Sequence, residues 1–232
     1  MSAATADFVI NHIRQDPNIL LCLPSGDTPT RTLKILVDEA RSGKVDFSHA
    51  HFVGLDEWVG MDRYNEGSCQ HYIYSNFFSP LKIAKEKITF FDAKAEDLVA
   101  ECKRVDQFIA DKGPIDLVVV GVGVNGHIGL NEPGSSFDSL CHTIDLEETT
   151  KKGAQKYFSD TKALQDGITL GLAHIMNAKT VVVIANGLTK AYIIHQIIEG
   201  TVTESVPGSV LQRHSNCHFF LDQDAASLLK AN

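Results

Sequence analysis

Short apolar runs alternate with segments of helical periodicity along almost the whole chain. Within residues 30–42, apolar side chains recur at the i, i+3, i+4 and i+7 positions of one buried helix face. Uninterrupted apolar runs such as Ile115–Val120 are typical of strands buried on both faces. The predicted strands are Ile19–Leu23, His51–Leu55, Ile88–Phe91, Ile115–Val120, Thr180–Ala185 and Cys217–Leu221, and the predicted helices lie near 30–42, 69–78, 95–111, 168–177 and 188–199.

This alternation predicts right-handed crossovers and therefore an α/β fold, a doubly wound, mostly parallel, Rossmann-like sheet with helices on both faces. The sequence shows no internal repeat or Pro-rich linker, so residues 1–232 are expected to form one domain. The stretch 145–166 is polar and has few apolar anchors, which predicts a lid. A merely solvated helix and loop would have the same composition.

Composition restricts the partners and the compartment. The net charge is −8 and there is no Lys/Arg-rich block, which argues against nucleic acid or an anionic membrane as a partner. No apolar stretch has transmembrane length, and the N-terminus lacks the features of a signal peptide. Five cysteines, an odd number without C-x-x-C, favour a reducing, cytoplasmic setting. We therefore expect a small molecule as the partner, bound by a monomer or a homo-oligomer.

The glycine-rich segment Gly121–Gly134 carries the strongest chemical signal. It follows the apolar run Ile115–Val120, at the end of a strand where open α/β sheets bind their ligands. Gly123 and Gly126 allow a substrate to approach the backbone closely. His127 and Glu132 supply an imidazole and a carboxylate for proton transfer. The segment is therefore predicted to be an active-site loop.

The first six residues of that segment also match the dinucleotide-binding pattern G-x-G-x-x-G. A dinucleotide-binding loop should open an amphipathic helix and belong to the first βα unit of its domain. Here the glycines lead into the turn-forming stretch 131–136, in the middle of the chain. NAD binding is therefore not expected, and no cofactor is predicted.

A second candidate follows the first strand, in Pro24-Ser-Gly-Asp-Thr-Pro29. Thr28 suits the N-cap position and Pro29 the first helical position. A turn built from Ser25, Gly26, Asp27 and Thr28 before a helix presents N–H groups and hydroxyls to a phosphate. The Asp27 carboxylate would repel such an anion unless it points away. A plain strand–helix connection with ordinary cap residues is the alternative.

Two further strands end in chemically useful residues. Asp56 and Glu57 follow the second strand, and because neighbouring residues of an extended chain alternate faces, only one of the two carboxylates can enter a cleft. Partial desolvation beside Trp58 would raise the pKa of that carboxyl and make it a base for a carbon acid. An ordinary polar loop start is the alternative. Lys190 follows the fifth strand near a helix start, where the helix dipole disfavours a cation unless an anion lies between them.

Other residue patterns give weaker signals. The pairs His49/His51 and His214/His218 lack an acidic third ligand and an H-E-x-x-H pattern, so no metal site is predicted. The chain contains no G-x-S-x-G elbow, and no cysteine has an evident base nearby in the sequence.

Six segments of the chain, in order, resemble the signature segments of the amino-sugar 6-phosphate deaminase/isomerase family, and the match spans almost the whole chain. The segment 127–133, His-Ile-Gly-Leu-Asn-Glu-Pro, is the most specific of them. The segments are Pro24–Pro29, Leu55–Val59, Gly121–Pro133, Gly167–Gly171, Lys190-Ala191 and Pro207–His214. Trp58, Gly67–Cys69, Cys141-His142 and His214–Asn216 look more like the galactosamine-6-phosphate branch than the glucosamine-6-phosphate one.

This resemblance implies a function and a role for each matching residue. A hexosamine 6-phosphate would be isomerised and deaminated to a ketohexose 6-phosphate and ammonia, without metal or redox cofactor. His127, oriented by Glu132, would open the sugar ring, and Asp56 would move the proton from C2 to C1. The Ser25–Thr28 turn and Lys190 would hold the phosphate.

Three departures from the family pattern affect these expectations. Asn125 stands where some members have an aspartate, and its amide can orient an imidazole but cannot stabilise its cation. Lys156 replaces a lid arginine, which keeps the charge and loses bidentate geometry. His142 and Ile144 fall near the places of basic residues that bind an allosteric effector in some members, so no such activation is expected.

The chain also begins in the family's first helix, without its usual first strand. The alternative functions are hydrolysis of a phosphosugar lactone, as in the related 6-phosphogluconolactonases, and non-catalytic sugar-phosphate sensing.

Overall fold

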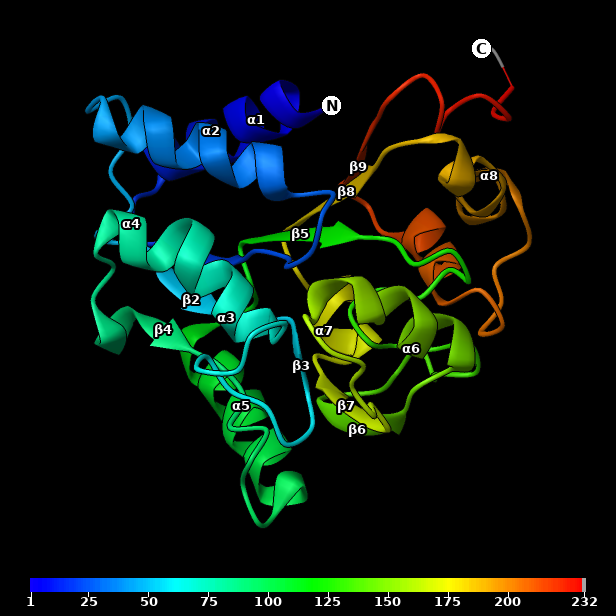
Figure 1. Cartoon of the computed structure of the whole chain (residues 1–232). Coiled ribbons are helices and arrows are strands. Elements are labelled where there is room, and N and C mark those ends of the chain that lie inside the picture. Colours follow the sequence, from blue (N-terminus) through cyan, green and yellow to red (C-terminus); the bar gives the residue numbers. More distant parts are fainter. Residues whose placement is uncertain (231–232) are drawn as a thin grey trace.

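Six parallel strands form the central sheet of the computed structural model, which describes residues 1–230 (Figure 1). The predicted domain of residues 1–232 thus includes two residues outside the described part. When the six strands of this sheet are counted in chain order, their spatial order is 3-2-1-4-5-6. The order therefore reverses between the first and fourth of them, which are β1 and β5. This confirms the predicted Rossmann-like fold. From edge to edge the strands are β4 (Ile88–Thr89), β2 (His51–Val53), β1 (Leu20–Cys22), β5 (Leu117–Gly121), β8 (Thr180–Ala185) and β9 (Cys217–Leu221).

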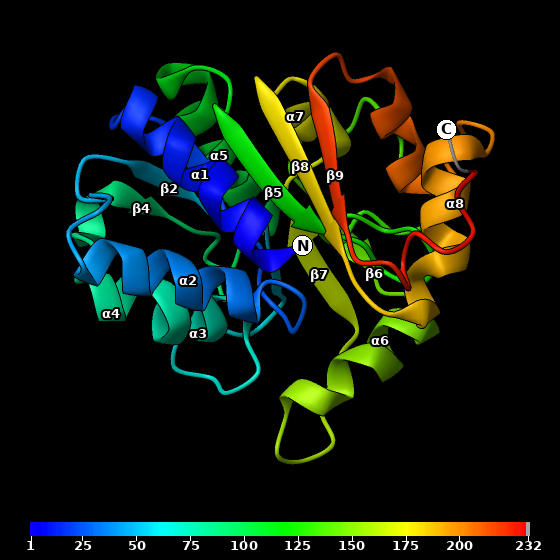
Figure 2. The same cartoon turned by 90° about the horizontal axis from the view of Figure 1, so that it is seen from above.

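Alternating side chains of the buried strands enter two separate cores, one on each face of the sheet. In β5, Leu117 and Val119 pack in one core, and Val118 and Val120 pack in the other. This is why the strands read as continuous apolar runs rather than as alternating ones. Helices cover both faces, as Figure 2 shows. One face carries α1 (Ser2–Gln15), α2 (Thr30–Arg41), α3 (Cys69–Ile73) with its π-helical continuation Tyr74–Phe78, and α4 (Ser79–Leu81); the other carries α5 (Leu98–Lys112), α7 (Leu172–Met176) and α8 (Ala191–Glu199).

A second, antiparallel sheet lies beside the first and was not predicted. It has the order β3 (Asp56–Trp58), β7 (Asp166–Thr169) and β6 (His142–Asp145). The predicted helix 168–177 is therefore wrong over its first residues, because Ile168 pairs with β3 and β6 and the helix begins only at Leu172. The second predicted strand, 51–55, likewise ends early at Val53. Strands β3, β6 and β7 are short and contain polar residues, so they lack the continuous apolar run that marks the short strands of the parallel sheet.

The predicted lid segment 145–166 contains α6 (Glu148–Ala154) and the 3-10 helix Gln155–Tyr157. It projects beyond the sheets in Figure 2. Ala154 and Leu164 are buried in a small apolar cluster with Trp58. The segment is thus anchored to β3, the strand that carries Asp56.

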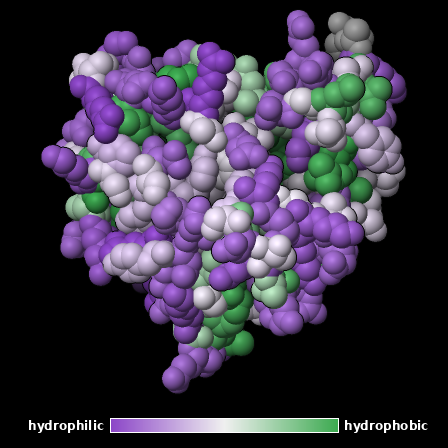
Figure 3. All heavy atoms as spheres, in the orientation of Figure 1, coloured by the Kyte–Doolittle hydropathy of each residue, from purple (hydrophilic) through white to green (hydrophobic). Residues whose placement is uncertain are grey.

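The surface gives no sign of a large exposed apolar area on the face that Figure 3 shows. Hydrophilic side chains cover most of this face, and apolar ones appear in small separate patches. Within residues 1–230, none of the helices has the length and apolarity needed to cross a membrane.

Candidate active site

A cavity of about 290 Å³ opens at the carboxyl ends of β1 and β5, where the strand order reverses. This is the place where open α/β sheets bind ligands. Loops from both sheets and the predicted lid contribute to its wall. Of the predicted site residues, those that line it are Ser25, Gly26, Asp27, Thr28, Asp56, Gly123, His127, Lys156 and Lys190. The fold thus brings together residues that lie up to 165 positions apart, from 25 to 190, in one cavity.

Three predicted site residues, Asn125, Glu132 and Gly126, lie outside the cavity wall. Asn125 and Glu132 lie behind His127, as described below. Gly126 faces away, toward the loop 201–208. A side chain at this position would collide with Val206, and Gly126 has a φ of +88°, so packing and backbone geometry explain the glycine. The structure therefore gives Gly126 a packing role rather than a place at the substrate.

The loop between β1 and α2 contains the turn 25–28, which was predicted to bind phosphate. Gly26 has a φ of +99°, a conformation that favours glycine, and its backbone lies against the Tyr157 hydroxyl. The helix starts one residue later than predicted: Pro29 is the N-cap residue of α2 rather than its first helical residue, so Thr28 does not cap it. No side-chain cap bonds the first N–H groups of α2. The N–H of Thr30 donates to the Asp27 carbonyl oxygen over 3.2 Å. The next N–H groups and the positive end of the helix dipole are the features of this turn that suit an anion.

Two lysines face this turn. Lys190, just before α8, donates from Nζ to the Val122 carbonyl oxygen over 2.6 Å. Burial lowers the pKa of Lys190, and the nearby Lys156 charge lowers it further. The Lys156 ammonium forms an ion pair with Asp27 at 2.5 Å. Both lysines thus line the cavity together with this turn, and the Asp27 carboxylate neutralises one of the two positive charges.

Asp56 and Glu57 point in opposite directions, as their alternation along β3 predicted. Asp56 lines the cavity and is 8% exposed. Burial raises the pKa of Asp56 to about 6, although a hydrogen bond from Cys69 and the charge of His127 lower it. The predicted upward shift of this pKa is confirmed. A carboxylate with this pKa is an effective proton acceptor near neutral pH.

Glu57 is completely buried on the other side of β3 and has a structural role. Its carboxylate accepts hydrogen bonds from the N–H groups of Cys69 and Gln70 and from the Ser68 hydroxyl. It also accepts from the N–H of Trp58. Glu57 thereby fixes the N-terminus of α3, which carries Cys69 against Asp56.

His127 and Glu132 form the expected imidazole–carboxylate pair. The His127 Nδ1 lies 3.5 Å from Glu132 Oε2 and 3.1 Å from the Thr150 hydroxyl of α6. Because Nδ1 has these partners, Nε2 is the nitrogen left for a substrate in the cavity. A side chain at position 123 would collide with the imidazole ring, so Gly123 lets the ring lie against the backbone.

Asn125 orients the carboxylate rather than the imidazole ring. Its Nδ2 donates to Glu132 Oε2 over 2.8 Å, and its Oδ1 accepts from the backbone N–H of His127 over 3.3 Å. Burial alone would raise the pKa of Glu132, but the hydrogen bonds from His127, Thr150 and Asn125 lower it below its ordinary value. Glu132 is therefore held ionised next to the imidazole.

Three further residues contact the site and were not found in the sequence. Thr150 lies in the predicted lid, Tyr157 borders the turn 25–28, and the thiol of Cys69 faces Asp56. No local motif marks Thr150 or Tyr157, because their contacts come from elements far away in the sequence. Cys69 follows Ser68, the N-cap of α3, so its position next to β3 could have been suspected from the helix start.

Comparison with known proteins places this geometry in a family. A sequence profile described as glucosamine-6-phosphate isomerases/6-phosphogluconolactonase matches residues 1–219. The chain belongs to this family. It is 38% identical over 226 residues to a glucosamine-6-phosphate deaminase of Halalkalibacterium halodurans, with 97% of this chain and 92% of that relative covered. It is 39% identical over 215 residues to one of Lachnoclostridium phytofermentans, which covers 92% of this chain and 91% of that relative.

Solved structures agree with this assignment. The chain matches a monomeric glucosamine-6-phosphate deaminase with a TM-score of 0.94 and 31% identity, over 98% of this chain and 95% of that one. A 6-phosphogluconolactonase from Trypanosoma brucei matches with a TM-score of 0.76 and 23% identity, over 99% and 94%. The second likeness shows that the lactonase shares the fold. The predicted family and fold class are confirmed.

Proposed function

We propose that this family member converts a hexosamine 6-phosphate to a ketohexose 6-phosphate and ammonia. The observation that carries the proposal is that Asp56 and His127 line one cavity together with the turn 25–28 and two lysines. A carbon-acid base, a ring-opening group and a phosphate site are what this reaction needs. The relatives named glucosamine-6-phosphate deaminase support the same reaction.

The phosphate would bind at the turn 25–28. The free N–H groups of α2, the Ser25 hydroxyl and the Lys190 ammonium surround that place. Lys156 would join them once phosphate displaces the Asp27 carboxylate from the ion pair. Binding at the phosphate holds the sugar in one orientation and makes the following proton transfers intramolecular.

The chemistry would begin at the ring. His127, held by Glu132, moves a proton from the C1 hydroxyl to the ring oxygen, which gives the open-chain aldehyde. The Asp56 carboxylate then removes the C2 proton, which the neighbouring carbonyl makes acidic, and an enolamine forms. Asp56 returns the proton to C1, and the C2 imine that results adds water and releases ammonia. The products are a ketohexose 6-phosphate and ammonia.

The predicted lid would control access to this reaction. Thr150 and Lys156 both come from segment 145–166 and contact His127 and Asp27 respectively. Closure of the segment over a bound substrate would therefore adjust the imidazole and the phosphate site together. All five cysteines are free thiols, which supports the cytoplasmic setting that we propose for the enzyme.

The resemblance favours galactosamine 6-phosphate over its C4 epimer, and an assay of both hexosamine 6-phosphates tests the function. We expect release of ammonia and appearance of the corresponding ketohexose 6-phosphate with at least one epimer. Lys190→Ala should raise KM for the phosphorylated sugar more than it lowers kcat, whereas Lys179→Ala on the opposite end of β8 should leave both unchanged. No ammonia from either epimer, together with hydrolysis of 6-phosphogluconolactone, would support the lactonase alternative. Binding without turnover would support a sensor.

A further inference from the structure

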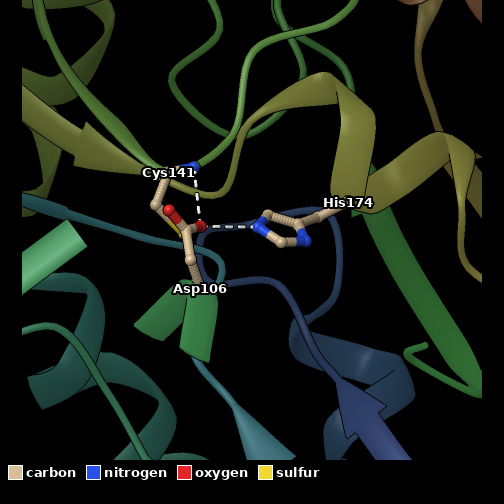
Figure 4. Close-up of side chains that lie close together, drawn as sticks. All are labelled: Asp106, Cys141 and His174. Carbon is tan, nitrogen blue, oxygen red and sulfur yellow. Dashed lines mark hydrogen bonds and ion pairs between the residues drawn. The ribbon is translucent and has the colours of Figure 1, made fainter. Parts of the chain in front are cut away.

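A second cluster of chemically active side chains lies away from the cavity, where α5, α7 and the start of β6 meet. It consists of Asp106, Cys141 and His174, shown in Figure 4. Their ligand atoms, one oxygen, one sulfur and one nitrogen, all lie within 4.8 Å of one another. None of the three lines the candidate active-site cavity. The proposed deaminase reaction therefore does not use them.

Asp106 is the centre of the cluster. Its Oδ1 accepts from His174 Nε2 over 2.6 Å and from the Cys141 backbone N–H over 3.0 Å. The imidazole ring and the backbone N–H both point at this one oxygen in Figure 4. Among residues 1–230, the ion pairs of Asp106 include no lysine or arginine. A largely buried carboxylate without a fixed cation is a place of negative potential.

The cluster lies mostly below the protein surface. Cys141 is 8% exposed and His174 is 9% exposed, so two donors are shielded from water. The Asp106 side chain is 21% exposed, which leaves one open side toward solvent.

We propose that Asp106, Cys141 and His174 bind a divalent transition-metal ion, with Zn²⁺ preferred and water as the fourth ligand. A thiolate, an imidazole and a carboxylate are the three ligand types that zinc accepts in tetrahedral sites. Binding releases the Cys141 thiol proton to solvent and moves the His174 proton from Nε2 to Nδ1. The hydrogen bond between His174 and Asp106 is replaced by bonds from both residues to the ion. Small side-chain movements are enough, because the donors already converge.

Such an ion would have a structural effect on the antiparallel sheet. Cys141 directly precedes β6, and His142 pairs with Thr169 of β7, which in turn pairs with Asp56 of β3. The ion would fasten the start of β6 to α5 and α7. It would thereby stiffen the sheet that carries Asp56, without contact with substrate.

Titration of the metal-free full-length protein with Co²⁺, under a reductant that does not chelate metals, tests the site. We expect one equivalent to bind, with a thiolate-to-cobalt charge-transfer band and the strong visible bands of tetrahedral Co²⁺. Zn²⁺ should displace the spectrum and raise the melting temperature, and EDTA should reverse that rise. Absence of tetrahedral bands in the folded wild-type protein would overturn the proposal.

Variants identify the ligands. Cys141→Ser and His174→Asn should each weaken Co²⁺ binding by more than about 10-fold, since even second-shell changes cost that much. Cys217→Ser, on β9 and outside the cluster, is the matched control and should retain the spectrum. Equal binding by wild type and Cys141→Ser would contradict the assignment. Because the readout is a spectrum, it does not depend on the proposed deaminase activity.

Discussion

The carboxylate of Asp27 lies 2.5 Å from the ammonium of Lys156, and both residues line the candidate active-site cavity. From the sequence, the Asp27 carboxylate was expected to repel a phosphate. In the structure its charge is neutralised by Lys156, which comes from the predicted lid. Both side chains are more than half exposed, so the pair contributes little to stability. Under the proposed function its importance is competition, because the phosphate of the substrate would have to take Lys156 from Asp27.

Removal of this competitor should improve substrate binding. We expect Asp27→Asn to lower KM for the hexosamine 6-phosphate by up to about fivefold, because an exposed pair is worth at most about 1 kcal/mol. Steady-state kinetics at low ionic strength measures the effect. Asp38→Asn on the exposed face of α2 makes the same change in net charge and should leave KM unchanged. An unchanged or higher KM in Asp27→Asn would show that Asp27 does not compete with the phosphate.

The rate should depend on pH through Asp56. The proposed base acts only when ionised, and burial raises the pKa of Asp56 to about 6. We therefore expect kcat/KM to fall about tenfold per pH unit below pH 6 and to level off above it. A pH–rate profile of the free enzyme, corrected for ionisation of the substrate phosphate, measures this limb. An acid limb near the ordinary aspartate pKa would contradict the desolvated position of Asp56.

Asp56→Asn should remove activity but not stability. Loss of the base is expected to lower kcat by at least about 10²-fold. It should also abolish exchange of the C2 proton with solvent. Because the folded-state pKa of Asp56 is raised, its ionised form opposes folding, and stability contributed at low pH is lost as the pH rises from about 4 to about 6. At pH 7 the variant should therefore melt at the same temperature or higher. Retained proton exchange would refute Asp56 as the base.

Glu57→Gln should lower the stability of the protein, in contrast to Asp56→Asn. An amide cannot accept all the hydrogen bonds that the Glu57 carboxylate receives from Ser68 and from backbone N–H groups, so buried donors are left unpaired. We expect a loss of about 1–3 kcal/mol in the free energy of unfolding, measured by denaturant titration. Comparison of the two neighbouring variants separates chemistry from folding on one strand. Equal effects on stability would mean that the two carboxyls do not differ in role.

His127→Gln should affect ring opening more than the later steps. We expect turnover of the cyclic substrate to fall by about 10²-fold or more, while proton exchange in an open-chain analogue falls much less. His142→Gln on β6, outside the cavity wall, serves as the control and should behave as wild type. An equal loss with cyclic and open-chain compounds would assign His127 to a different step.

The sequence by itself determined the strand and helix alternation, because a sheet buried on both faces requires continuous apolar runs and its covering helices require one apolar stripe. It also indicated Asp56, His127 and Lys190, because strand ends of a parallel sheet gather at one edge. It could not reveal the antiparallel sheet. Strands β3, β6 and β7 contain polar residues and no continuous apolar run, and they form only because distant segments supply their partners.

Only the tertiary structure decided which side chains enter the cavity and which support it from behind. Whether Asp56 or Glu57 enters the cavity depends on the pairing of β3 with β7, which orients every side chain of the strand. Contacts such as Thr150 with His127, and the convergence of Asp106, Cys141 and His174, join elements far apart in the chain. Local residue patterns reflect local backbone preferences, whereas burial and long-range partners exist only once the chain has folded.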